Sequence, residues 1–112
     1  MPTTDDSHYT DTANLPWRPT PAPGVSWKKL RFDPETGESS VLLRFEPGAS
    51  YATHRHPRGE QYLVLAGSLE DGGRTWGEGS HVWHPPGSVH RPHSREGCLL
   101  FVTLPTPIEV VD

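Results

Sequence analysis

Short apolar runs alternate with turn-forming residues along the chain from residue 25 onward. No segment carries the 3.6-residue periodicity of an amphipathic helix over about ten residues, whereas turn signals recur about every 8 to 12 residues. Clusters rich in Gly or Pro separate the runs at 33–37, 46–48 and 85–87, and a short acidic link follows Gly67. The pattern predicts strands over residues 25–32, 40–45, 50–56, 61–66, 74–76, 80–84 and 98–104.

Composition favours the same fold class. A chain of 112 residues is long enough for one compact domain and too short for two. Its 11 Gly and 13 Pro residues suit turns and disfavour helix interiors, which argues against helical bundles and coiled coils. Hydrophobic residues make up only 32% of the chain, so the core is expected to be modest. An all-β sandwich or barrel is therefore predicted.

The first 24 residues differ from the rest of the chain. Residues 1–14 are polar, rich in Thr and Asp, and lack periodicity, so we expect a disordered tail. Residues 15–24 contain four prolines at nearly alternate positions, which favours an extended arm that Leu15 and Trp17 could anchor on the domain. The barrel itself is expected over residues 25–112.

Charge and cysteine content exclude several classes of function. The net charge is −4, and no basic run exceeds Lys28-Lys29, so no nucleic-acid partner is expected. No apolar stretch approaches the roughly 20 residues of a membrane span, and the N-terminus lacks the apolar region of a signal peptide. The single cysteine, Cys98, rules out an intramolecular disulfide and a Cys-rich zinc site. A cytoplasmic protein without a membrane partner is the expectation.

Histidine is the unusual component, because six of the seven histidines lie between residues 54 and 93. On a strand, His54 and His56 project from the same face, and Arg55 between them points the other way. Glu60 follows a Pro-Arg-Gly kink that can turn its carboxylate toward the same point. Two imidazoles and a carboxylate on one side can bind a divalent metal. A His-x-His pair also arises by chance, however, and a lone Glu is more often a solvated turn residue.

A second segment strengthens the metal interpretation, because it places His90 just after a Pro-Pro-Gly turn. Together the two segments match both sequence motifs of the cupin superfamily, which this chain resembles. The matching positions are Gly48, His54, His56, Glu60 and Gly67 in the first motif, and Gly79, Pro85, Gly87 and His90 in the second. The second motif usually ends in Asn, a structural residue, where this chain has Ser94.

Five segments of this chain recur in one cupin subgroup: Leu15-Pro16-Trp17, 43–48, 63–67, 85–88 and 94–98. The chain is similar to that subgroup over roughly residues 15–104. That subgroup contains the cupin domain of zinc-dependent anti-sigma factors and the acetylacetone-cleaving dioxygenases. Members usually have two consecutive Glu residues where this chain has Glu60-Gln61, and Asn where it has His84. Anti-sigma members also carry an N-terminal domain with zinc-binding His and Cys, whereas residues 1–24 are short and lack Cys. We therefore expect a stand-alone cupin.

The resemblance implies a small jelly-roll barrel (a double-stranded β-helix) with a metal bound inside one open end. It assigns His54, His56, Glu60 and His90 as the metal ligands. In the diketone-cleaving members three His residues hold ferrous iron, and in the anti-sigma cupins all four residues hold zinc. Fe(II) and Zn both fit this ligand set, and Mn, Ni and Cu remain open.

Two functions of different classes follow from the resemblance. The first is a non-haem Fe(II) dioxygenase that acts on a small diketone-like or enolisable substrate. The second is a non-enzymatic zinc-binding cupin that binds or senses a small ligand. Sugar isomerisation or another metal-cupin activity makes up the remainder. In each case the partner is a small molecule, and a homodimer is expected because apolar faces and the Pro-rich arm are left unpaired.

Several other residues are candidates for a supporting role. His84 precedes the turn that leads to His90 and is the better candidate of the strand pair His81 and His84, which face opposite sides. Tyr62 and Val64 share the alternation of Glu60 and are expected to line the cavity, although packing alone would explain both. Cys98 is expected to be a buried apolar residue, and His93 to be exposed. Arg55, Arg58, Arg91 and Arg95 either form a positive rim or are simply solvated.

Overall fold

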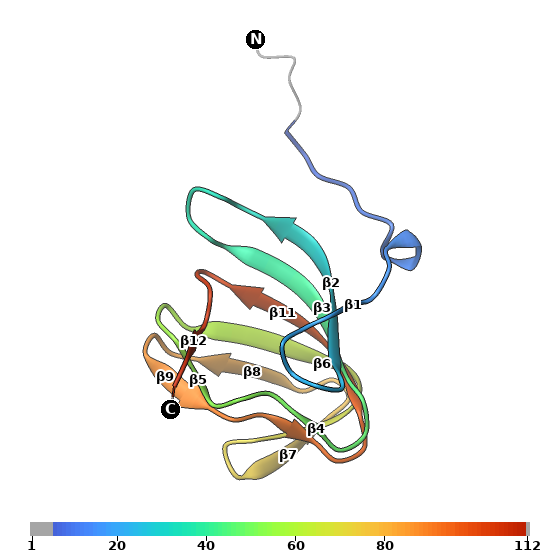
Figure 1. Ribbon diagram of the computed structural model, residues 1–112, viewed down its shortest axis with the longest axis vertical. Helices are drawn as coiled ribbons and strands as arrows, with labels where there is room; N and C mark the ends of the chain where they lie inside the picture. The colour runs from blue at the N-terminus through green and yellow to red at the C-terminus, as the bar shows by residue number, and fades with distance from the viewer. Residues whose placement is uncertain (1–5, 112) are drawn as a thin grey trace.

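The computed structural model describes residues 6–111 and contains almost only β-structure (Figure 1). None of the helical structure in this part of the chain is long and apolar enough to cross a membrane. The single 3-10 turn among the described residues, η1, spans Thr12–Asn14. The strands are β1 (Arg18–Pro19), β2 (Val25–Phe32), β3 (Ser39–Phe45), β4 (Ala49–Ser50), β5 (His54–His56), β6 (Glu60–Asp71), β7 (Arg74–Gly77), β8 (His81–His84), β9 (Ser88–His90), β10 (His93–Ser94), β11 (Cys98–Leu104) and β12 (Glu109–Val110).

These strands form two antiparallel sheets that face each other as a jelly roll (Figure 1). The larger sheet has the order β1-β2-β3-β11-β6-β10-β4, with β7 and β8 also paired to β6. The smaller sheet has the order β12-β5-β9. The expected all-β cupin fold is therefore confirmed.

The core lies between the two sheets and follows from strand alternation. On β11, every second side chain is buried, beginning with Cys98 and continuing through Leu100 and Val102. Val41 and Phe45 on β3 pack against this row. The predicted burial of Cys98 is confirmed.

The predicted strand boundaries match β2 and β11, lie within one residue of β3, β7 and β8, and differ elsewhere for identifiable reasons. The run 50–56 is interrupted between β4 and β5, because Ser50 pairs with β10 while His54 pairs with β9 in the other sheet. The expectation that strand structure ends at Gly67 and gives way to an acidic link is wrong, because β6 runs through this segment. A register shift opposite Leu99 and Leu100, together with the positive φ of Gly67, lets β6 continue to Asp71 and pair with β7.

The N-terminal arm lies against the outer side of β2. β1 pairs with β2, and the Trp17 ring stacks with the cationic groups of Lys28 and Arg44, at 4.9 and 4.3 Å from its centroid. Lys28 Nζ also donates a hydrogen bond to the carbonyl of Thr12 at 2.7 Å. Of the expected disordered tail, residues 1–5 lie outside the described residues.

Candidate metal centre

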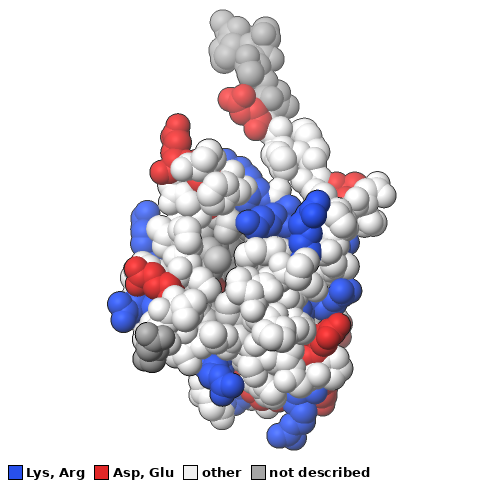
Figure 2. Space-filling model, viewed as in Figure 1, with Lys and Arg blue, Asp and Glu red and all other residues white. Residues whose placement is uncertain are grey.

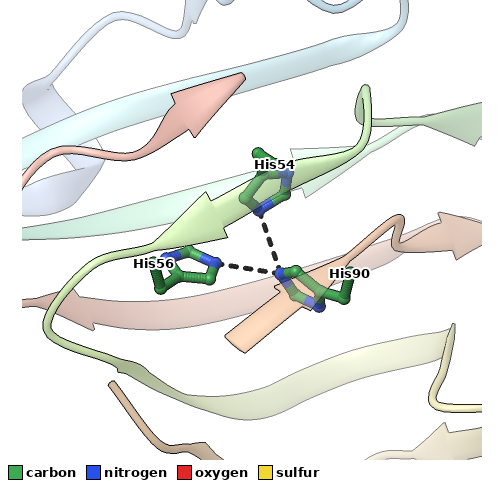
Figure 3. Close-up of side chains that lie close together, drawn as sticks. All are labelled: His54, His56 and His90. Carbon is green, nitrogen blue, oxygen red and sulfur yellow. Dashed lines mark hydrogen bonds between the residues drawn. The ribbon is translucent and has the colours of Figure 1, made fainter. Parts of the chain in front are cut away.

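Strand pairing in the smaller sheet brings three histidines together. β5 is its central strand, and the register pairs His54 with His90 and His56 with Ser88. Because side chains alternate along β5, His54 and His56 both point inward and are buried, while Arg55 is exposed and lies 3.7 Å from Glu109. Figure 3 shows the three imidazoles pointing toward one another from β5 and β9.

The Nε2 atoms of these rings meet at one point. His90 Nε2 lies 2.9 Å from His54 Nε2 and 2.9 Å from His56 Nε2 (Figure 3). Each ring offers one nitrogen, and the three nitrogens lie within 4.8 Å of one another. The arrangement could therefore hold a metal ion with three imidazole ligands.

The other ring nitrogens fix the protonation of two of these imidazoles. His54 Nδ1 lies 2.7 Å from the carbonyl of Ala52, and His90 Nδ1 lies 3.0 Å from a carboxylate oxygen of Asp71. A carbonyl and a carboxylate only accept, so both Nδ1 atoms carry a proton, and each ring in its neutral form presents a bare lone pair at Nε2. Two lone pairs facing each other at 2.9 Å repel unless a cation or an extra proton lies between them.

Burial makes the extra proton costly. Desolvation lowers the pKa of His54, against the opposing effect of its hydrogen bond to Ala52. Desolvation, together with the neighbouring imidazoles, lowers the pKa of His56 to about 3. At neutral pH these rings are therefore neutral bases. The donor set fits a borderline divalent cation.

Glu60 places a carboxylate beside the three nitrogens. Its Oε1 lies 3.4 Å from His56 Nε2 and 3.6 Å from His90 Nε2, and it is buried without a hydrogen-bond partner among residues 6–111. Desolvation raises the pKa of this carboxyl group to about 7. The kink expected before Glu60 is present at Gly59, where φ is +88° and an added Cβ would lie 2.6 Å from the carbonyl oxygen of His84.

Asp71 supports the site and was missed from the sequence. Its buried carboxylate accepts hydrogen bonds from Tyr62 Oη at 2.6 Å, His84 Nε2 at 2.8 Å and His90 Nδ1 at 3.0 Å. Burial alone would raise the pKa of Asp71, but these hydrogen bonds outweigh it and hold the pKa well below its usual value. The alternation of Leu69 and Asp71 after Gly67 was the signal available.

His84 is the histidine of the pair on β8 that faces the site. Its hydrogen bond to Asp71 raises the pKa of the imidazole. His81 is exposed and bonds to Gln61 instead. His93 is half-buried rather than exposed, because its Nδ1 lies 2.6 Å from Ser50 Oγ on the neighbouring strand.

Ser94 takes a structural position where the motif usually has Asn. It is fully buried, and its hydroxyl donates to the carbonyl of Ser68 at 2.6 Å. This bond ties β10 to β6, which carries both Glu60 and Asp71.

A cavity of about 500 Å³ opens onto the candidate metal centre. The wall of this cavity includes His54, His56, Glu60, Tyr62 and His90. Val64 does not line it, because it is packed in the core with 1% of its surface exposed. The rest of the wall is mostly apolar, and includes Trp27, Val41, Leu43, Phe45, Leu69, Leu100, Val102, Leu104 and Ile108.

Comparison with known families identifies the fold family. The profile of the ChrR cupin-like domain matches residues 5–106, which is most of the chain. The chain belongs to the ChrR cupin-like family. This cupin is 27% identical over 73 residues to the acetylacetone-cleaving enzyme of Acinetobacter johnsonii. The match covers 60% of this cupin and 48% of the relative, so the chain spans about half the length of the curated relative it matches.

Solved structures show the same fold. The crystal structure of a candidate acetylacetone dioxygenase from Methylibium petroleiphilum PM1 has a TM-score of 0.91 at 20% identity, covering 100% of this cupin and 85% of that chain. An acetylacetone dioxygenase from A. johnsonii has a TM-score of 0.86 at 21% identity, covering 100% and 82%. In the complex of Rhodobacter sphaeroides SigE with the anti-sigma ChrR, the TM-score is 0.71 at 24% identity, covering 84% and 50%.

Proposed function

We propose that this cupin is a non-haem iron dioxygenase that acts on a small diketone-like or enolisable compound. The observation that carries the proposal is the pair of lone pairs on His54 and His90, which face each other at 2.9 Å beside an apolar cavity. A site built from neutral imidazoles and open on one side leaves room for a substrate. The acetylacetone-cleaving relative supports this choice of substrate class.

His54, His56 and His90 would hold the metal through their Nε2 atoms, with Glu60 as a fourth candidate. Bound Fe(II) supplies a Lewis acid for a chelating enolate and redox chemistry with molecular oxygen. Ala52 and Asp71 keep the imidazoles of His54 and His90 in the tautomer that a metal needs.

The remaining wall of the cavity would bind and orient the substrate. Leu43, Leu100 and Val102 give it apolar surfaces that exclude water from the reacting end. Tyr62 cannot donate its hydroxyl to substrate while that hydroxyl is committed to Asp71 at 2.6 Å. Its ring therefore acts as part of the wall.

A zinc-binding cupin without catalytic activity is the second candidate. It is favoured by the position of Glu60, whose unpaired Oε1 lies within 3.6 Å of two imidazole nitrogens. Three imidazoles and a carboxylate complete a four-ligand zinc site.

Metal analysis and oxygen uptake distinguish these functions. The protein is purified without added metal, analysed for iron and zinc, and then loaded anaerobically with ferrous iron. Oxygen consumption is measured with a panel of 1,3-diketones, and the zinc-loaded protein serves as the control. Uptake that depends on both iron and diketone supports the dioxygenase. If no diketone raises oxygen uptake above the buffer rate, the dioxygenase is ruled out.

We also propose that the chain forms a homodimer. Leu63 and Leu65 on β6 and Trp83 on β8 form an exposed apolar strip on the outside of the larger sheet. A second copy could cover this strip. The molar mass by light scattering, compared for the wild type and Trp83→Lys, tests the dimer, and a monomeric wild type at high concentration contradicts it.

A further inference from the structure

Lys29 is the one lysine or arginine among the described residues that line the cavity. It lies on β2, where Trp27 pairs with Leu43 and Lys29 pairs with Val41. All four of these residues line the cavity, because alternation places them on the inner face of the strands. Lys29 is itself exposed, so its ammonium group reaches solvent as well as the cavity.

The Lys29 ammonium has no anionic partner among residues 6–111. It lies 4.7 Å from the centroid of the Trp27 ring, a weak cation–π contact for an exposed group. The carboxylates on neighbouring segments are already engaged, since Glu38 lies 3.5 Å from Arg31 and Glu109 lies 3.7 Å from Arg55. The positive charge at this part of the wall is therefore available to a ligand.

Other positive charges lie near the part of the cavity wall that carries Lys29, and they favour an anionic ligand there. Figure 2 shows lysine and arginine side chains gathered beside the hollow, near the N-terminal arm. Lys28 and Arg44 are held against Trp17 on the outer face of the sheet, so they add to the local potential without lining the cavity.

The cavity is also large for a five-carbon diketone. Its volume of about 500 Å³ lies in the range that holds drug-sized ligands. The wall between the histidines and Lys29 is mostly apolar, which suits a hydrocarbon chain or ring.

We propose that the ligand of this cavity is an amphipathic acid. Its chelating oxygen pair lies at His54, His56 and His90, its apolar body lies along the wall, and its terminal carboxylate pairs with the Lys29 ammonium. The inference rests on the proposed function for the chelating end only. Lys29 is then a specificity-determining residue that selects carboxylated substrates over neutral ones of the same length.

The test compares binding of an acid and its neutral ester. The zinc-loaded full chain, which cannot turn over, is titrated calorimetrically with 5,7-dioxooctanoate and with its methyl ester. The acid is expected to bind about tenfold more tightly, since a hydrogen bond between charged groups adds roughly that much affinity. Lys29→Met should remove this preference. Lys28→Met is the matched control, because it removes the same charge from the adjacent residue on the opposite face, and it should keep the preference.

Three results would overturn the inference: no binding of the acid, equal binding of acid and ester by the wild type, or an acid preference that survives Lys29→Met. The last result would mean that the carboxylate binds the metal instead. Failure of the proposed function is distinguishable, because it appears as absent oxygen uptake by the ferrous protein. Even if the ferrous protein takes up no oxygen, the role of Lys29 is supported when Lys29→Met loses the preference for the acid.

Discussion

The Nδ1 atom of His90 donates a hydrogen bond to the carboxylate of Asp71, 3.0 Å away on a different strand. This bond turns the bare Nε2 of His90 toward His54 and His56. A carboxylate behind a metal-binding imidazole fixes the ring tautomer and strengthens the ligand. The candidate metal centre is thus organised from β6 as well as from the two strands that carry the histidines.

Replacing Asp71 should weaken metal binding although Asp71 itself does not face the metal position. We expect Asp71→Ala to reduce zinc affinity about 10- to 100-fold, because the His90 ring loses the partner that orients it. Affinity is measured by competition with a chromophoric chelator. Asp71→Asn should recover part of the loss, since the amide oxygen still accepts from Nδ1.

Tyr62→Phe is the control for this prediction, because the Tyr62 hydroxyl donates to the same carboxylate and Tyr62 belongs to neither group of potential metal ligands. It should change zinc affinity much less than Asp71→Ala does. Equal losses in the two variants would mean that Asp71 acts through general stability rather than through His90.

The fold and the positions of two candidate ligands could be predicted because they follow from patterns within short segments of the sequence. Alternation along a strand places His54 and His56 on one side, and the paired motif spacing predicted the cupin fold and family, which are confirmed. The structure brings His90 to the same point because its strand pairs with β5. Metal ligation by these residues stays a prediction.

Asp71 could not be predicted because its position depends on a non-local register. The shift in pairing between β6 and β11 moves the inward-facing side chains from Tyr62 and Val64 to Leu69 and Asp71. The alternation of buried and exposed residues along β6 changes phase at this irregularity, so it does not predict from the first half of the strand that Asp71 faces inward. The same limit applies to Val64, whose alternation matches Tyr62 although only Tyr62 reaches the cavity.

Two motif glycines should differ sharply in their tolerance to alanine. Both have a positive φ, of +73° at Gly67 and +87° at Gly79. A Cβ at Gly67 would overlap the carbonyl oxygen of Gly97 and lie 2.8 Å from the Cα of Cys98, whereas a Cβ at Gly79 would meet no atom of the described residues within 4 Å. Gly79→Ala should cost only the conformational penalty of about 1–2 kcal/mol.

Gly67→Ala should cost more than about 4 kcal/mol, because two backbone segments must separate. The free energy of unfolding from urea titrations checks both values. Similar costs for the two variants would show that the approach of Gly67 to the next strand does not constrain the fold.

Ionisation of the Cys98 thiol should lower the free energy of unfolding at alkaline pH. Burial raises the pKa of its thiol from 9.0 to about 11, so the folded protein keeps a proton that the unfolded chain loses. The unfolded state therefore binds fewer protons between these values, and the contribution is present below pH 9 and is lost as the pH rises through about 11. Its upper bound is about 3 kcal/mol, since each pKa unit corresponds to about 1.4 kcal/mol.

The measurement is the unfolding free energy of the wild type minus that of Cys98→Ala between pH 7 and 11. This difference should shrink as the pH rises, while both proteins share every other titration. A difference that is constant with pH would mean that the thiol is not protected from ionisation by burial.

The ligand variants should separate a three-histidine site from a four-ligand site. His90→Ala removes the nitrogen that lies 2.9 Å from both other imidazoles, so we expect loss of bound metal. Glu60→Ala should retain the metal if three imidazoles are sufficient, and should lose it if the carboxylate completes a zinc site. Metal content is measured after gel filtration, and circular dichroism checks that each variant is folded. His81→Ala is the matched control, because that imidazole is exposed and, in the part of the chain that the structure describes, bonds to Gln61 alone. Full metal occupancy in the double variant His54→Ala, His56→Ala would refute the whole ligand assignment.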